Sequence, residues 1–286
     1  MFSYVVGGIA IFLFAYNPVL QYLSPGPSRL PRTPRPRINE SLLAIDGPNS
    51  TALDCPPDSY SVHIFSKAPL VIYIENFLSQ DERAHLLEIS EPLFEPSTVT
   101  SDGDTTRRDA RVRDSEVALV PRTDAVRCVE ARARAFQGWR DDLWVERLRT
   151  QRYSENGHYA HHFDWGSGAR GWGRVSSFMV WVQADDGIEG GGTEFPLLRR
   201  EAPGEKWCRW VECPEQPRDA DDGETAAETG VPPGVTFRPV AGNAVFWENF
   251  RPDGTGRGWD ESWHAGLPVT KGTKVGLNIW SWGRLN

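Results

Sequence analysis

The chain has 286 residues, 39% of them apolar, which is enough to bury a sizeable hydrophobic core. Its formal net charge of −8 provides no positive field for phosphates, which argues against nucleic acid as a partner. The chain has four lysines, Lys67, Lys206, Lys271 and Lys274, so each can be considered separately as a partner for a specific anion.

The first 24 residues predict a membrane segment. No residue between Phe2 and Leu23 is charged, and a run of about 20 apolar residues is what a bilayer-spanning helix needs. We therefore predict a transmembrane anchor over residues 1–24. An uncleaved or cleaved signal peptide is the alternative, although no basic residue precedes the apolar run.

Residues 25–58 are rich in proline and serine and predict an extended stalk between this anchor and a folded domain. Two acceptor patterns for N-glycosylation, at Asn39 and Asn49, favour a single-pass protein of the endoplasmic reticulum membrane with a lumenal domain. A group of arginines after the apolar segment favours the opposite orientation; they are Arg29, Arg32, Arg35 and Arg37.

Four cysteines permit two disulfides or four buried thiols, and none forms a CxxC pair of the kind that binds zinc. Cys208 and Cys213 are close enough in sequence to close a small loop. Cys55 and Cys128 would form the second bridge if the compartment is oxidising.

The predicted domain, residues 59–286, begins with β-rich sequence over 61–78 and continues with a helix from Ser79, where Ser79 and Glu82 match a capping box. After an irregular loop, apolar residues at intervals of three to four predict a second helix within 122–139. His63 and His85 fall on the first strand and first helix, where we expect packing or surface roles.

From Trp144 onward, short apolar segments separated by glycine, proline and acidic turns predict strands of a barrel or double-sheet fold. The predicted fold class is therefore mainly β with flanking helices. Residues 212–234 carry seven carboxylates and predict a solvated loop. The predicted strands are VERLRTQRY, VSSFMVWVQ, GVTFRPV, NAVFWEN and VGLNIWSW.

The segment GHYAHHFDW contains three of the six histidines and one aspartate. On an extended chain, His162 and Asp164 share one face while His161 points away. The remote His264 supplies a third ligand, and His158 and His161 are left with surface or supporting roles.

Two histidines and one carboxylate leave three metal positions open, an arrangement typical of non-haem Fe(II) that also binds a cosubstrate and oxygen. Lys274 lies ten residues after His264. If these two residues lay on adjacent antiparallel strands, the ammonium would face the metal at a distance that 2-oxoglutarate could bridge.

The ordered series Y-x-x-x-G-x-Y-x-x-H-x-D, GGGTEFP and HAGLPVTKGTK resembles the prolyl 4-hydroxylase branch of the 2-oxoglutarate- and Fe(II)-dependent dioxygenases. The resemblance implies a double-stranded β-helix of the jelly-roll type, with L-ascorbate as a reductant of oxidised iron. It also implies iron ligands and a cosubstrate pocket: His162, Asp164 and His264 for iron, and Lys274, Tyr153, Thr193 and Trp280 for 2-oxoglutarate.

The resulting hypothesis is an enzyme that hydroxylates prolyl residues in a peptide or protein, with tryptophan rings available for a proline-rich chain. Leu267 stands where animal collagen enzymes commonly have cysteine, and this departure concerns the substrate. Three alternatives remain: a hydroxylase of a free amino acid or small metabolite, a zinc hydrolase, and a non-catalytic membrane-tethered binding module.

Overall fold

The computed structural model describes residues 40–47, 50–100, 106–138, 140–165, 171–199, 205–213 and 234–285, which all belong to one compact unit, Arg35–Asn286. The predicted anchor, residues 1–24, lies outside the described residues, as does most of the acidic loop. Within the described residues, the helices are too short or too polar to cross a bilayer.

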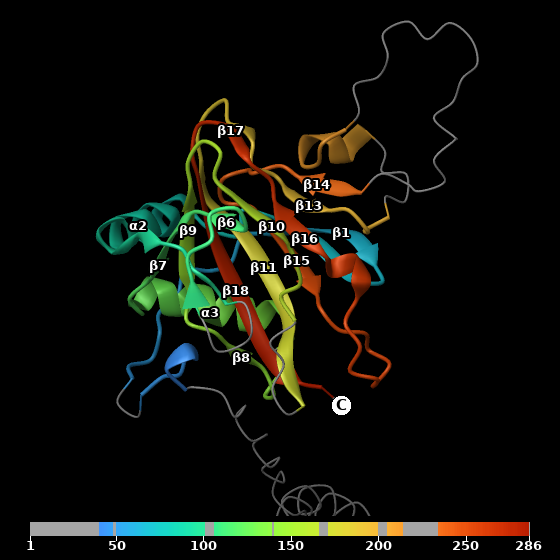
Figure 1. Ribbon diagram of the computed structural model, residues 1–286. Coiled ribbons are helices and arrows are strands. Elements are labelled where there is room, and N and C mark those ends of the chain that lie inside the picture. Colours follow the sequence, from blue (N-terminus) through green and yellow to red (C-terminus); the bar gives the residue numbers. More distant parts are fainter. Residues whose placement is uncertain are drawn as a thin grey trace, which may run out of the picture. The chain divides into compact units, whose positions relative to one another are not determined.

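Two antiparallel sheets form the centre of the fold (Figure 1). The larger has nine strands in the order β1-β2-β15-β11-β18-β9-β7-β3, with β8 paired to β18, and the smaller has the order β14-β13-β16-β10-β6. The larger sheet contains β1 (Ser61–Lys67), β2 (Leu70–Glu75), β3 (Glu95–Pro96), β7 (Glu116–Leu119), β8 (Trp144–Val145), β9 (Arg149–Tyr153), β11 (Trp172–Ala184), β15 (Ala244–Glu248) and β18 (Lys274–Arg284).

The smaller sheet and two minor strand pairs complete the β structure. The smaller sheet contains β6 (Arg113–Asp114), β10 (His158–His162), β13 (Thr193–Phe195), β14 (Val235–Phe237) and β16 (His264–Gly266). The minor pairs are β4 (Val99–Thr100) with β5 (Thr106–Arg107), and β12 (Glu189–Gly190) with β17 (Val269–Lys271). The five predicted strand segments all contain strands, which confirms a mainly β fold, and the strands form two sheets, as a jelly roll requires.

The described residues form two α-helices, α2 (Gln80–Ser90) and α3 (Asp124–Phe136), both at the predicted places. The capping box at α2 is confirmed: the Glu82 backbone N–H donates to the Ser79 hydroxyl, and the Ser79 backbone N–H donates to the Glu82 carboxylate. Short 3-10 helices occupy η1 (Glu40–Leu42), η2 (Glu91–Leu93), η3 (Glu205–Arg209) and η4 (Asp260–Ser262).

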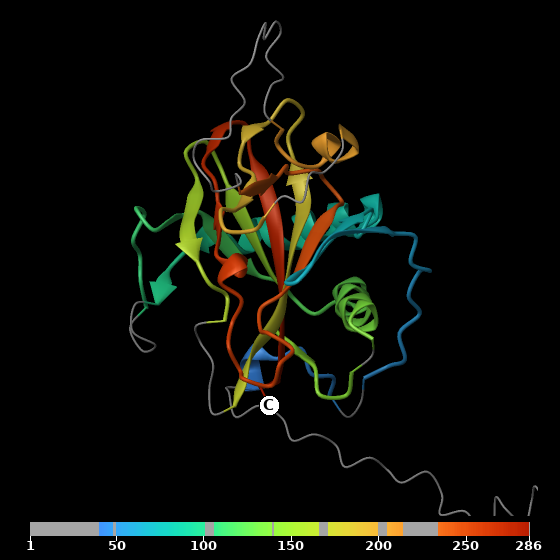
Figure 2. The same ribbon diagram turned by 90° about the vertical axis from the view of Figure 1, so that its right-hand side faces the viewer.

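Strand β11 shows how the layers pack, because alternate side chains point to opposite faces. Phe178 and Val180 belong to the core cluster shared with α2 and α3, whereas Met179 and Trp181 belong to the cluster between the sheets. The helices therefore cover the outer face of the larger sheet (Figure 2), and the inner faces of both sheets enclose the second core.

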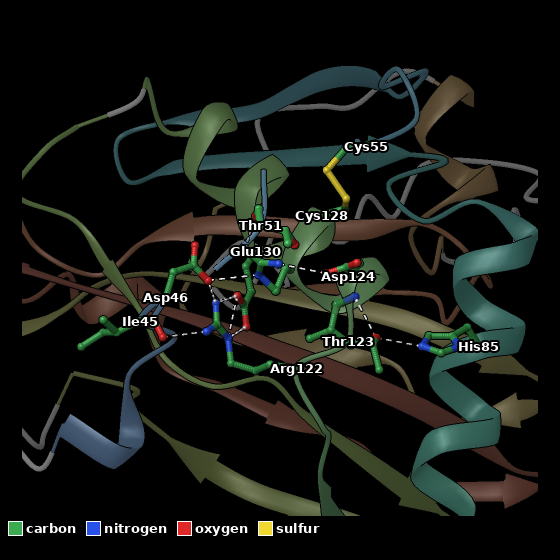
Figure 3. A network of polar contacts seen from close by, with 12 residues as sticks. Ile45, Asp46, Thr51, Cys55, His85, Arg122, Thr123, Asp124, Cys128 and Glu130 are labelled. Atoms are coloured by element: carbon green, nitrogen blue, oxygen red, sulfur yellow. Dashed lines mark hydrogen bonds and ion pairs between the residues drawn. A yellow bond between two sulfur atoms is a disulfide. The ribbon is translucent and has the colours of Figure 1, made fainter. Parts of the chain in front are cut away.

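The described part of the predicted stalk, from Glu40 to Asp58, differs from the expectation of an extended spacer. Leu43 is buried and pairs with Glu146, and the Cys55–Cys128 disulfide ties this segment to α3. Figure 3 shows how Arg122 connects Asp46 of the same segment to Glu130 of α3. The proline-rich composition did not reveal these tertiary contacts, which hold residues 40–58 against the domain.

Both disulfides that the sequence allowed are present, Cys55–Cys128 and Cys208–Cys213. The reading of four buried thiols is therefore wrong for this structure.

Candidate metal and cosubstrate site

The three predicted ligands, two of them close together in the chain and one about 100 residues later, meet at the end of the smaller sheet. His162 ends β10, His264 begins β16, and the two residues face each other as register partners. The Nε2 atoms of His162 and His264 lie 3.7 Å and 3.9 Å from the two carboxylate oxygens of Asp164. Each residue offers one ligand atom, and these atoms all lie within 4.8 Å of one another, so one ion could contact all three.

Hydrogen bonds behind the ligands hold them in place. The Nδ1 atoms of His162 and His264 lie 2.8 Å from the carbonyl oxygens of Ala160 and Ser262, where each N–H can donate. The Nε2 lone pairs are then directed toward Asp164, as metal-binding imidazoles require. The donor set, two imidazole nitrogens and one carboxylate oxygen, fits Fe(II) with open coordination positions.

Electrostatics also favour the metal-binding protonation states. Burial, followed by the charge of His264, lowers the pKa of His162, so this ring stays neutral. Burial alone would raise the pKa of Asp164, but His264, His162 and Arg174 outweigh it, and the pKa is lowered. A neutral imidazole beside an ionised carboxylate is the state that binds a cation.

A hydroxyl supports the carboxylate from behind. Ser177 Oγ donates to Asp164 Oδ2 over 2.7 Å, and Asn249 Nδ2 donates to Ser177 Oγ over 3.0 Å. The sequence analysis missed both residues because they lie on β11 and directly after β15. The inward-facing serine in the otherwise apolar segment VSSFMVWVQ was the available signal.

Lys274 is 1% exposed and lines the same cavity as His162 and His264. Its Nζ donates to the carbonyl oxygen of Gly191 and lies 4.8 Å from the centre of the Tyr153 ring. Among the described residues no carboxylate forms an ion pair with it, and burial lowers its pKa to about 7. A buried ammonium without an anion is costly, so the site fits a ligand that brings a carboxylate.

The expected strand arrangement around Lys274 was wrong in one respect. His264 and Lys274 do not lie on adjacent strands: β16 belongs to the smaller sheet and β18 to the larger, and β17 intervenes in the chain. The two side chains line one cavity because the sheets face each other. Ten residues therefore span the gap between the sheets.

The three further residues predicted for the cosubstrate differ in position. Tyr153 and Thr193 line the cavity with Lys274, as expected. Trp280 does not line it: its ring lies under the guanidinium of Arg174, at 4.0 Å. Asn278, two residues earlier on the same face of β18, lines the cavity instead, and the sequence analysis did not single it out.

The neighbouring histidines point elsewhere, as predicted. His161 Nε2 lies 2.7 Å from a Glu194 carboxylate oxygen on the exposed side of the sheet. His158 Nδ1 lies 2.9 Å from the Asn156 carbonyl oxygen. Of the three clustered histidines, His162 alone belongs to the three-residue metal cluster.

Comparison with known proteins agrees with this geometry. The model of the 2OG-Fe(II) oxygenase superfamily matches residues 148–282, the span that contains the three candidate metal ligands and Lys274. Prolyl 4-hydroxylase 5 of Arabidopsis thaliana is 25% identical over 228 residues, which cover 77% of this chain and 70% of that protein. The transmembrane prolyl 4-hydroxylase of Homo sapiens is 29% identical over 156 residues, 47% of this chain and 29% of that protein.

A solved structure, the viral collagen prolyl hydroxylase of Paramecium Bursaria Chlorella virus-1, matches with a TM-score of 0.48 and 20% identity over 74% of this chain and 95% of that one. The matches in sequence confirm the predicted resemblance to the 2-oxoglutarate- and Fe(II)-dependent dioxygenases and, among them, to the prolyl 4-hydroxylases.

Proposed function

We propose that this protein hydroxylates prolyl residues in a peptide or protein, with Fe(II) held by His162, Asp164 and His264 and 2-oxoglutarate held by Lys274. The observation that carries the proposal is the buried ammonium of Lys274, which has no carboxylate partner among the described residues and shares a cavity with both histidines. The names of the curated relatives support the prolyl substrate.

Each part of the chain has a distinct task in this reaction. The two imidazoles and the carboxylate present three donors from one side and leave the other side of the ion for ligands. Bound Fe(II) would activate dioxygen, one oxygen atom of which would enter a C–H bond to give C–OH while the other would enter succinate as 2-oxoglutarate loses CO2. Lys274 orients the cosubstrate through its far carboxylate, next to Tyr153 and Thr193, and the walls formed by Met179 and Trp247 exclude water.

The test measures two products. Protein purified without oxygen is incubated in aerated buffer with Fe(II), 2-oxoglutarate and a proline-rich peptide, and succinate is measured together with the gain of one oxygen atom on the peptide. We expect both products from the parent and neither from His162→Ala. His161→Ala is the matched control, because this neighbouring histidine contacts Glu194 instead of the cluster, and it should keep activity.

Two results would contradict the proposal in different ways. Succinate at the parent level from His162→Ala would remove the metal assignment. If free amino acids stimulate succinate formation and no peptide does, the substrate is a small metabolite and not a prolyl peptide. Addition of L-ascorbate should extend the number of turnovers, as expected for an iron centre that becomes oxidised between cycles.

The proposal extends to location: a single-pass protein of the endoplasmic reticulum membrane, anchored by residues 1–24, with a lumenal domain. Two disulfides support an oxidising compartment. Protease treatment of sealed microsomes tests this proposal. Protection of a glycosylated domain is expected, and digestion without detergent would place the domain in the cytosol.

A further inference from the structure

A second and larger cavity lies on the outer face of the nine-stranded sheet. Its volume is about 540 Å³, within the range common for ligand pockets, and it shares no lining residue with the cavity around Lys274. It lies beyond the end of α3 at Phe136, between the sheet and the loop that follows β15. Helix α3 thus ends at the edge of the cavity.

The floor of the cavity is apolar. Ile72 of β2 and Phe246 of β15 are register partners and share it with Leu70. On the edge strand β1, Val62 and Ile64 extend the same surface and are 51% and 57% exposed, the highest values for large hydrophobic side chains among the described residues. A continuous exposed apolar surface on an edge strand marks a binding site more often than chance exposure.

Among the described residues, one arginine of the lining has no ion-pair partner. Arg140 forms an ion pair with Asp142 over 2.8 Å, and Arg251 forms one with Glu261 over 3.8 Å. Burial raises the pKa of Glu248, with Arg140 acting against it. Arg284 forms no ion pair with any described residue and is available to an anion.

We propose that this cavity binds a single-chain amphiphile with an anionic head group, of the long-chain fatty acid class. The acyl chain would cover Val62, Ile64 and Ile72, and the carboxylate would pair with Arg284. The charge favours an anionic head group, because the exposed guanidinium of Arg284 would gain an ion-pair partner that an uncharged chain does not bring. A second copy of this chain fits less well, because β1 brings a histidine and a lysine but no carboxylate to the arginines.

The test uses dodecanoate, dodecanol and dodecyltrimethylammonium below their micelle concentrations, with binding to the full chain measured by calorimetry. Dodecanoate should bind most tightly, and affinity should rise about fourfold for each methylene in the series from octanoate. Arg284→Glu should weaken dodecanoate at least tenfold and leave dodecanol unchanged. Ile64→Asp should weaken both, whereas Leu119→Asp is the matched control, a strand residue 41% exposed outside the cavity.

Several outcomes would overturn the inference. They are equal affinity for the anionic and cationic amphiphiles, binding only above the micelle concentration, or no effect of Ile64→Asp. Binding only to phosphatidylserine vesicles, and not to monomeric dodecanoate, would show a membrane surface instead of a fatty acid site. Because the two cavities share no residue, 2-oxoglutarate binding should be the same in all these variants, which separates this test from that of the proposed function.

Discussion

Replacement of Lys274 by methionine tests the physical basis of the cosubstrate site, because it should stabilise the protein and weaken 2-oxoglutarate binding at once. Methionine keeps an unbranched side chain of similar length and removes the ammonium. The pKa of Lys274 falls from the usual 10.5 to about 7 because of burial. At pH 7 this shift corresponds to a destabilisation on the order of 4 kcal/mol, which methionine would relieve.

The lost hydrogen bond to the Gly191 carbonyl offsets about 1 kcal/mol of that gain. We therefore expect the metal-free variant to unfold with a free energy higher by about 2 to 3 kcal/mol. Loss of the charge partner should weaken 2-oxoglutarate binding by about 3 kcal/mol, roughly 150-fold. The free energy of unfolding comes from urea titration, and affinity from calorimetry on the Mn(II)-loaded protein.

Lys274→Arg is the matched control, because it keeps a positive charge that does not titrate near neutrality. The reasoning is refuted if Lys274→Met is less stable than the parent and still binds 2-oxoglutarate with parental affinity. Such a result would mean that Lys274 serves the fold through the Gly191 contact and has no part in binding an anion.

Three further predictions concern pH, metal affinity and the disulfides. Because Lys274 has a pKa near 7 and 2-oxoglutarate binds its protonated form, 2-oxoglutarate should bind about 15-fold more weakly at pH 8.5 than at pH 7. Calorimetry should find this pH dependence in the parent and none in Lys274→Arg, since His162 and Asp164 are already deprotonated at pH 7. Ser177→Ala should lower Mn(II) affinity about tenfold in calorimetry, because the hydroxyl that orients Asp164 is lost, and unchanged affinity would deny it that role. Removal of the Cys55–Cys128 disulfide, whose cysteines are 73 residues apart, should lower the free energy of unfolding by about 4 kcal/mol in urea titration. Removal of Cys208–Cys213, whose cysteines are 5 residues apart, should lower it by about 2 kcal/mol. Equal losses would contradict the chain-entropy explanation.

The sequence predicted well that the three candidate ligands come together, because most of the evidence for it is local. His162 and Asp164 are two residues apart on an extended segment, so alternation alone places them on one face. His264 was chosen as the third ligand by elimination, since the other remote histidines, His63 and His85, have no second ligand at a suitable spacing in the sequence. In the structure these two contact Glu75 and Thr123.

Residues that act across the space between the two sheets were not predictable in the same way. Ser177 lies on β11 of the larger sheet and donates to Asp164, which follows β10 of the smaller sheet, and no short-range pattern encodes how the two sheets face each other. The pairing of distant strands explains the error for Trp280. Trp280 lies two residues after Asn278, so alternation correctly places both side chains on the same face of β18. The sequence does not show, however, that the neighbouring strand β11 places Arg174 over the Trp280 ring.

The position of Lys274 connects these two levels of prediction. The spacing of ten residues from His264 suggested a hairpin within one sheet, and the chain instead crosses from the smaller sheet to the larger. In a hairpin the two side chains would lie side by side on one surface, where water would screen the ammonium. Across two facing sheets the ammonium is buried opposite the histidines, and its charge is left to be balanced by a ligand. The facing sheets therefore suit Lys274 to the anchoring role proposed for it with 2-oxoglutarate and, in the absence of an anion, make it a source of instability.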